Sequence, residues 1–209
     1  MKNTFGNNIS VTLFGESHGA SVGCVIDGMA PGIKVDEDNI RLLLSLRRPS
    51  GAISTARREE DEFVIQSGVY NGYTTGTPIC IIIPNSDTRS KDYGEMARLA
   101  RPSHADYTAH IKYRGYEDFR GGGHFSGRIT AALVAAGGII IPALMKKGIL
   151  IGTHISSCAG VKDRAFDDIE NDIKTLSSLQ FAVLTIAYLR TLSPYLYPHW
   201  STSTISPSL

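Results

Sequence analysis

The stretch FRGGGHFSGRITAALVAAGGIIIPALM, residues Phe119 to Met145, joins a polar, glycine-rich part directly to a long apolar run. The polar part, Phe119 to Gly127, is called the glycine segment below. The apolar part, Ile129 to Met145, is rich in alanine and apolar nearly all round, which favours a helix buried against a sheet. Gly137 and Gly138 within it indicate close packing against a neighbour. The stretch therefore predicts a core helix that anchors the glycine segment before it.

The glycine segment matches neither of two common nucleotide-binding motifs. Gly122 and Gly127 have the glycine spacing of a P-loop. However, Arg128 and Ile129 stand where Lys and the metal-binding Ser or Thr belong, which argues against a nucleoside triphosphatase. The dinucleotide fingerprint GxGxxG fails as well, because the polar residues EDFR, and no apolar strand, precede the glycines.

Bare glycine backbone beside a helix start nevertheless suits a bound anion or a planar ring. Main-chain N–H groups are accessible where no side chain covers them, and the start of a helix favours negative charge. Charge and further hydrogen bonds are available from Arg120, Ser126 and Arg128. The segment is therefore a candidate binding site, and the alternative is a mobile surface loop.

Four further runs have the alternation or the apolar content of short strands. They are Ile9–Phe14, Val22–Ile26, Phe63–Tyr70 and Ile79–Ile83, the last two joined by NGYTTGTP. Between the second and third runs, Asp36 or Asp38 is placed to cap a helix. The apolar stripe of that helix includes Ile40, Leu43 and Leu44. The pattern predicts an α+β fold with short strands.

Two adjacent arginines, Arg47 and Arg48, end this predicted helix. The residues Pro49, Ser50 and Gly51 follow at once, so we expect the helix to break there and hold both guanidinium groups at the mouth of a loop. Such a pair is a candidate site for an anionic ligand. The alternative is two solvated arginines that interact favourably with the helix dipole.

Two histidines lie in polar loops that are framed by glycine or proline. His18 follows the first strand in GESHG, and His104 lies in RPSHAD between Arg101 and Asp106. Imidazole is suited to proton transfer near neutral pH, while nearby arginines hold a phosphate or a carboxylate. A metal site is the rival interpretation, since His104, Asp106 and His110 form an HxD pattern of the kind a hydrolase uses. The flanking arginines argue against a second positive centre there.

The composition excludes several classes of protein. The chain has 209 residues, 42% hydrophobic and 20% charged, with a formal net charge of +1, so no global field gathers nucleic acid or an anionic membrane. Cys24, Cys80 and Cys158 are far apart and in apolar company, which indicates buried thiols in a reducing cytoplasm. No targeting segment is evident, and we expect no membrane span, because Pro142 and two lysines interrupt the run Ile139 to Leu150.

Several long motifs, in order, resemble the chorismate synthase family. They are TFGNNISVTLFGESHGASVGCVIDGMAPGI, LRRPSGAIST, SGVYNGYTTGTPI, DTRSKDYGE, RPSHADYTAHIKYRGYEDFRGGGHFSGR and ITAALVAAGGI. The resemblance runs from about Thr4 to roughly Leu184. It implies a β-α-β sandwich with antiparallel sheets packed around helices, and a homotetramer in the full-length family.

The same resemblance implies a lyase of the shikimate pathway, in aromatic amino-acid biosynthesis. Its substrate is the small molecule 5-enolpyruvylshikimate 3-phosphate, and a 1,4-anti elimination gives chorismate and phosphate. The family needs reduced FMN although there is no net redox change, and NADPH reduces the flavin in some members. No metal, nucleic acid or membrane is implied, and the expected location is the cytoplasm.

The family's functional residues are carried over position by position. The histidine of GESHG is His18, which protonates the departing phosphate, and that of RPxHAD is His104, which protonates or hydrogen-bonds the reduced flavin. The flavin contacts after the three glycines fall on His124, Phe125 and Ser126, where many members have RSS.

The family's arginine pair for the phosphorylated substrate or for NADP falls on Arg47 and Arg48. Arg101 and Arg128 are further candidates for the same anionic ligands. A further arginine that many members carry a few residues later is absent from GAIST. This departure weakens the expectation of nucleotide binding.

The end of the chain departs most from the family pattern. From Thr185 the tail TIAYLRTLSPYLYPHWSTSTISPSL has almost no charged residues and no clear period. We therefore expect residues 1–184 to be the N-terminal part of a single chorismate synthase domain, incomplete at its C-terminus, followed by a tail, 185–209, that a frameshift or premature stop explains. One alternative is a remnant that binds flavin or phosphate without turnover; a more distant one is a metal-dependent phosphohydrolase.

Overall fold

The structure, a computed structural model, describes residues 2–48, 60–86, 99–158, 160–177, 179 and 182–185. The chain divides into two compact units. The first comprises Met1–Arg48 and Arg57–Ala143, and the second comprises Pro49–Ala56 and Leu144–Leu209. The predicted tail beyond Thr185 and most of the polar loop after Pro84 lie outside the described residues.

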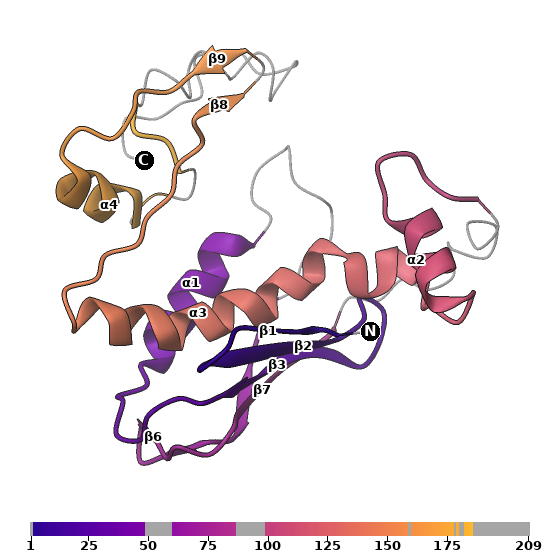
Figure 1. Cartoon of the computed structure of the whole chain (residues 1–209), viewed down its shortest axis with the longest axis horizontal. Helices are drawn as coiled ribbons and strands as arrows, with labels where there is room; N and C mark the ends of the chain where they lie inside the picture. The colour runs from indigo at the N-terminus through magenta and orange to yellow at the C-terminus, as the bar shows by residue number, and fades with distance from the viewer. Residues whose placement is uncertain are drawn as a thin grey trace. The chain divides into compact units, whose positions relative to one another are not determined.

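A five-stranded antiparallel sheet forms the base of the first unit (Figure 1). Its strands, in spatial order, are β1 (Thr4–Phe5), β2 (Ser10–Gly15), β3 (Ser21–Asp27), β7 (Ile79–Pro84) and β4 (Val64–Ser67). Three of the four predicted strand runs correspond to single strands of this sheet. Because one face of the sheet is covered by helices, the mixed α+β class with helices packed on an antiparallel sheet is confirmed.

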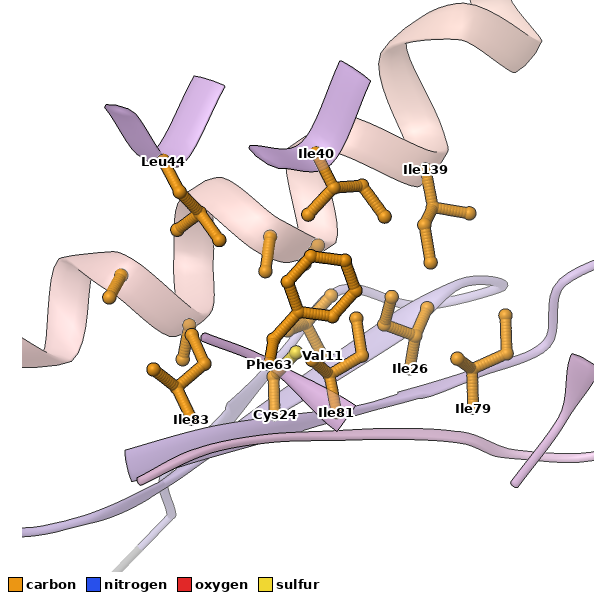
Figure 2. Packing of buried hydrophobic residues seen from close by; sticks show 14 of the residues in the cluster. Val11, Cys24, Ile26, Ile40, Leu44, Phe63, Ile79, Ile81, Ile83 and Ile139 are labelled. Atoms are coloured by element: carbon orange, nitrogen blue, oxygen red, sulfur yellow. The ribbon is translucent and has the colours of Figure 1, made fainter. Parts of the chain in front are cut away.

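The core lies between this sheet and two helices, α1 (Glu37–Arg47) and α3 (Thr130–Met145) (Figure 2). Alternate residues of β3 and β7 point to the same face, and Cys24 is paired in register with Ile81. The fully buried side chains of the two strands are Val22, Cys24, Ile26, Ile79, Ile81 and Ile83. The helices contribute Ile40, Leu44 and Ile139 from above. The period-2 pattern of the strands thus supplies one complete wall of the core.

The two helices approach closely where α3 contains a proline. Pro142 has no N–H to donate to the carbonyl of Gly138, four residues earlier. The side chain of Asn39 in α1 donates to that carbonyl instead, at 3.3 Å. A Cβ at Gly138 would lie 2.9 Å from Cγ1 of Ile40, so the glycine permits the close approach. The predicted close packing of the glycine pair is therefore confirmed at Gly138.

Helix α1 is capped by the first of the two aspartates that the sequence offered, Asp36 or Asp38. Asp36 is its N-cap and accepts a hydrogen bond from the backbone N–H of Asn39 at 3.0 Å. Ile40 and Leu44 are buried, Leu43 is half-buried, and the helix ends at Arg47, as the sequence predicted. The capping carboxylate and the basic last turn both complement the helix dipole.

Helix α3 follows the short helical turn Gly127–Ile129 without a break. Gly127–Met145 is a helical stretch of 19 residues with a mean hydropathy of 1.8, which is enough, by length and composition only, to cross a membrane. The sequence led us to expect no membrane span, whereas this stretch meets the requirement for one by length and composition. Its buried residues Ala131, Ala132, Ala135, Ala136, Gly138 and Ile139 belong to the core, as in the central helix of a soluble protein.

Two local elements differ from the sequence expectation. The run Phe63–Tyr70 is not one strand, because Gly68 has a φ of +83° and a Cβ there would lie 2.6 Å from the Cα of Ile79. The chain turns at this point, and β5 (Val69–Tyr70) pairs with β6 (Tyr73–Thr74) in a separate hairpin. The polar segment after His104 also forms a helix, α2 (Asp106–Tyr113), which has only Ala109 fully buried.

The second unit has a small hairpin and one amphipathic helix. Strands β8 (Ser157–Cys158) and β9 (Val161–Lys162) pair antiparallel, and α4 spans Ile169–Ser177. The Asp163 carboxylate accepts backbone hydrogen bonds from Arg164, Leu184 and Thr185, and its pKa lies below the ordinary value although burial opposes the shift. These bonds fix the end of the described chain to the hairpin.

The three cysteines are free thiols, as the sequence predicted. Cys24 is buried, and its burial, with a smaller contribution from Cys80, raises its pKa to about 12. Cys80 and Cys158 are only half-buried, which differs from the expectation of burial for all three. Because the thiolate is the reactive form, Cys24 is inert at neutral pH.

Candidate functional site

His18 lies in a tight turn between β2 and β3. The backbone N–H of Gly19 donates to the carbonyl of Glu16 at 3.1 Å and closes the turn around Ser17 and His18. A Cβ built on Gly121 would lie 2.2 Å from Cε1 of His18 and 3.0 Å from Oγ of Ser17. The imidazole therefore packs directly on the bare backbone of the glycine segment.

His104 contacts the next glycine of the same segment. A Cβ on Gly122 would lie 3.3 Å from Cε1 of His104. Because His18 contacts Gly121, two histidines that are far apart in the sequence meet on adjacent glycines. The sequence analysis proposed both histidines and the glycine segment separately, and the structure brings all of them together.

The glycine segment has a backbone conformation that other residues rarely adopt. The short helical turn η3 (Arg120–Phe125) contains Gly121, Gly122 and Gly123 with φ of +58°, +84° and +54°. At Gly123 a Cβ would overlap the carbonyl oxygen of Asp118, at 1.9 Å. The carbonyl of Gly123 accepts a hydrogen bond from the N–H of Ser17 at 3.0 Å. The segment is therefore a turn of glycines with positive φ, of which Gly122 and Gly123 are buried, and it is hydrogen-bonded to the His18 turn.

An ion pair secures the start of the glycine segment. Arg120 donates to the carboxylate of Asp118 from Nε at 2.8 Å and from Nη2 at 2.7 Å. These hydrogen bonds hold the pKa of Asp118 below its ordinary value, against the opposing effect of burial, and the charge of His18 contributes in the same direction. Because Arg120 is engaged in this way, its first role is to order the turn that contacts His18.

Another bidentate pair supports His104. Arg101 donates to the carboxylate of Asp106 from Nε at 2.7 Å and from Nη2 at 2.9 Å. Nδ1 of His104 lies 3.8 Å from the same carboxylate. The hydrogen bonds from Arg101 lower the pKa of Asp106 to about 2, although burial opposes the shift. Arg101, predicted to contact an anionic ligand, thus pairs with the first residue of α2.

The depressed pKa of Asp106 predicts how the stability of the pair depends on pH. Its folded pKa is about 2 and its ordinary value is 3.8, so the pairing contributes fully above about pH 4 and is lost as pH falls towards 2. We expect the difference in unfolding free energy between wild type and Asp106→Asn to shrink over this range. Urea denaturation at pH 6, 4 and 3 measures it, and a difference that stays constant with pH would contradict the assignment.

Asp61 joins two of the predicted arginines. Its side chain is fully buried, and its carboxylate accepts from Arg47 at 2.6 Å on one oxygen and from Arg128 on the other. The side chain of Arg128 is 3% exposed and that of Arg47 is 18% exposed. The end of α1 is thereby joined to the residue that follows the glycine segment.

Arg128 also reaches the strand end beside the His18 turn. Its Nε donates to Oδ1 of Asn85 at 2.8 Å, and its Nη2 donates to the carbonyl of Pro84 at 3.0 Å. With Asp61 on Nη1, the guanidinium is engaged on three sides. The sequence analysis expected Arg128 to contact a substrate, and in the described structure its partners are protein groups; contact with a substrate stays a prediction.

The two arginines at the end of α1 each have an N–H group that could bind a further acceptor. The Nε atoms of Arg47 and Arg48 are buried and have no hydrogen-bond partner among the residues that the structure describes. A buried guanidinium N–H without an acceptor is costly, and an anionic oxygen would satisfy it. The predicted anion site at Arg47 and Arg48 is therefore consistent with their geometry.

The predicted flavin contacts His124 and Phe125 line a cavity of about 1010 Å³ between β2, α2 and the glycine segment. Nδ1 of His124 lies 2.8 Å from the carbonyl of Gly15. The ring of Phe125 is tilted against Tyr113 at 6.0 Å, with Nζ of Lys112 at 5.8 Å from its centroid. The cavity thus combines aromatic surface with charges of both signs, since Glu117 and Asp118 line it as well as Lys112.

Ser126 and the two catalytic candidates do not line this cavity. The hydroxyl of Ser126 accepts from the N–H of Arg128 at 3.3 Å and caps the turn η4 (Gly127–Ile129) that leads into α3. His18 and His104 lie on the glycine segment, of which Gly122 reaches the cavity wall.

Two residues of this site were not proposed from the sequence. Asn85 comes just after the predicted strand Ile79–Ile83, and Asp61 comes just before the predicted strand run Phe63–Tyr70; neither belongs to a motif that predicts a site. Asp61 has a φ of +54°, and both acquire partners that are distant in the sequence. No local signal identifies such partners; only the polar character of a residue next to a buried strand hints at them.

The metal interpretation finds no support in the described residues. Within the ranges that the structure covers, no group of three or more His, Cys, Asp or Glu side chains is arranged to hold a metal ion. Nδ1 of His110 lies 3.0 Å from Glu117, and Asp106 is occupied by Arg101. His104 and Asp106 lie close together, but His110 pairs with Glu117 and does not complete a three-residue group with them.

Comparison with known proteins relates the chain to one family. A sequence model described as chorismate synthase matches residues 9–189. A chorismate synthase of Pyrococcus abyssi (strain GE5 / Orsay) is 48% identical over 157 residues, which are 75% of this chain and 44% of that protein. A chorismate synthase of Chitinophaga pinensis is 47% identical over 161 residues, 77% of this chain and 48% of its own length.

A solved structure gives the same result at the level of the fold. A crystal structure of chorismate synthase superposes with a TM-score of 0.63 at 25% sequence identity, covering 90% of this chain and 52% of that one. The chain spans about half the length of the curated relatives it matches.

Proposed function

The chain belongs to the chorismate synthase family, and on that premise we propose that it carries the histidine-bearing part of a lyase site. The reaction is the 1,4-anti elimination of phosphate from 5-enolpyruvylshikimate 3-phosphate to give chorismate, a step of aromatic amino-acid biosynthesis. One observation carries the proposal: His18 and His104 contact the adjacent glycines Gly121 and Gly122. Two groups able to transfer protons thus contact the same glycine turn.

His18 is the proposed acid for the departing phosphate. Its turn is joined to the glycine segment through the hydrogen bond from Ser17 to Gly123, which limits how far the imidazole can move. Proton transfer in a transition state requires a group held within hydrogen-bond reach, and an imidazole is suited to it near neutral pH. His104 is the proposed hydrogen-bond partner of the reduced flavin, and its side chain is 42% exposed, so a ligand has access to it.

Arg47 and Arg48 are the proposed contacts for the substrate phosphate or for NADP. Their buried Nε donors lack partners among the described residues, and an anionic oxygen supplies what they need. Arg101 and Arg128 are further proposed contacts, although each already holds a carboxylate. We propose that these two act first by fixing His104 and the residues around His18.

The residues of the glycine segment fit a flavin ring. The cavity of about 1010 Å³ is large enough for a flavin, and Phe125 offers a ring that is 41% exposed. His124 and Phe125 are the proposed contacts inside the cavity, with Lys112 close to the aromatic surface. Ser126, the third residue that the family resemblance implies, does not line this cavity, and its contact with flavin is proposed from the resemblance alone. Reduced FMN, when bound, supplies reducing power that is restored within each turnover, since the reaction has no net redox change. NADPH is the proposed source of reduced flavin.

The remaining family properties are proposals for this chain. We propose a small-molecule substrate, a homotetrameric assembly and a cytoplasmic location, with no nucleic-acid or membrane partner. The second candidate is a protein that binds flavin or phosphate without turnover; the similarity to curated chorismate synthases does not favour it over the lyase.

A chorismate assay with reduced FMN tests the proposed function. We expect His18→Ala and His104→Ala each to lower the rate by roughly 10²- to 10⁴-fold, the usual contribution of a positioned acid or base. Lys174→Ala is the control, because its side chain is 64% exposed, pairs with Glu170 on α4 and does not line the cavity. Turnover that survives both changes would refute the assignment. An FMN fluorescence titration distinguishes the lyase from the binding-only alternative, because the alternative predicts that FMN binds while no chorismate forms.

A further inference from the structure

The side-chain amide of Asn85 lies between the His18 turn and Arg128. Its Nδ2 donates to the carbonyl of Glu16 at 3.0 Å and to the carbonyl of Gly19 at 2.9 Å. These carbonyls belong to the first and last residues of the turn that contains His18. The backbone N–H of Asn85 donates to the carbonyl of Ala20 at 3.0 Å. One residue thus holds both ends of the turn and the residue that follows it.

The chemistry of its partners determines how the amide is oriented. Oδ1 accepts from Nε of Arg128 at 2.8 Å. A guanidinium can only donate and backbone carbonyls can only accept, so a flipped amide would oppose a donor with a donor and place an acceptor against two acceptors. An aspartate at this position keeps the shape and the contact with Arg128, but it has no N–H for the turn. The three contacts together therefore specify asparagine.

Arg128 is itself fixed, which makes it a firm anchor for the amide. Its guanidinium donates to Asp61 and to the carbonyl of Pro84, and its side chain is 3% exposed. It also follows the glycine segment, whose Gly121 backbone contacts the His18 ring. The same piece of chain therefore reaches His18 twice: directly through the glycines, and indirectly through Arg128 and Asn85.

We propose that Asn85 is a positioning residue that sets the place of His18 and ties it to Arg128. The amide holds the turn from the strand side while the glycine segment holds the imidazole from the other, so that neither contact alone fixes the ring. The catalytic meaning of this arrangement rests on the proposed function of His18. The placement itself does not, because it is a property of the folded chain.

Asn85→Asp in the 209-residue chain tests the proposal by two measurements. Histidine ring signals in ¹H–¹³C NMR spectra report the surroundings of His18, with His110 as a reference in the same spectrum. We expect the His18 signals to move and their pH titration to change while those of His110 stay. In the chorismate assay we expect kcat to fall by about 10²-fold with a smaller change in KM, as for a displaced catalytic group.

Asn39→Asp is the matched control. The Asn39 amide also donates to a backbone carbonyl, that of Gly138, but it lies between α1 and α3. We expect this change to leave the His18 signals as in wild type. His18 signals that are equal in Asn85→Asp and wild type overturn the proposal, even if stability falls.

The remaining outcomes also decide the question. If the wild-type chain makes no chorismate, the proposed function fails, while the His18 signals still decide the role of Asn85. If Asn85→Asp does not fold, nuclear Overhauser contacts in the wild type between the Asn85 side-chain amide protons and the Hα protons of Gly19 take its place. The presence of these contacts supports the proposal that the Asn85 amide holds the His18 turn, and their absence overturns it.

Discussion

Gly121→Ala is expected to displace His18 and to lower any rate that depends on it by about 10²-fold, the usual cost of moving a catalytic group by an ångström. The added Cβ would lie 2.2 Å from Cε1 and 2.3 Å from Nδ1 of His18, closer than non-bonded atoms come. Its φ of +58° is also unfavourable for alanine, by roughly 1–2 kcal/mol. The imidazole therefore moves or the turn opens.

Gly127→Ala is the control for this prediction. It lies in the same segment, but nothing is within 4 Å of its built Cβ and its φ is not positive. Gly122→Ala is an intermediate case, because the contact with His104 is 3.3 Å. The loss of chorismate rate and the shift of the His18 NMR signals should be largest for the Gly121 variant, smaller for the Gly122 variant and smallest for the Gly127 variant. If the Gly121 and Gly127 variants have the same chorismate rate and the same His18 signals, the close contact between Gly121 and His18 does not affect function.

Asp61→Asn is expected to destabilise the fold by about 3–5 kcal/mol, the cost of removing one partner from a buried ion pair. The side chain of Asp61 is fully buried, and it is the shared acceptor of Arg47 and Arg128. Asparagine tolerates the φ of +54°, so the change removes charge without adding backbone strain. Since domains are stable by only roughly 5–15 kcal/mol, urea denaturation should show a much lower midpoint.

Asp38→Asn provides the comparison with an exposed pair. Asp38 pairs with Arg41 at 3.0 Å, but its side chain is 95% exposed. Solvent screens such a pair, so we expect a change below about 1 kcal/mol. Similar losses for Asp61→Asn and Asp38→Asn would mean that the buried carboxylate does not organise the arginines.

The elements of the first unit follow largely from periodicity. The strands β2, β3 and β7, the cap at Asp36 and the apolar helix α3 were predictable, because each depends on side chains that are neighbours in the sequence or repeat at a short interval. The break at Gly68 was not, because it depends on how close that glycine comes to Ile79, a residue of another strand. The polar composition around α2 also concealed a helix with a single buried alanine.

The candidate site also combines features that were predictable from the sequence with features that depend on distant segments of the chain. His18, His104 and the glycine segment were recognisable from the sequence, since each has the chemistry of a site in its own few residues. The contacts of the histidines with Gly121 and Gly122 depend on the approach of three distant segments, and so do the partnerships of Asp61 and Asn85. Short-range patterns thus predicted the strands, the resemblance of long motifs indicated the family, and residue types pointed to the two histidines proposed to transfer protons. Which backbone each imidazole contacts, and which carboxylate and amide hold Arg128, follows from the antiparallel pairing and helix packing that bring those segments together.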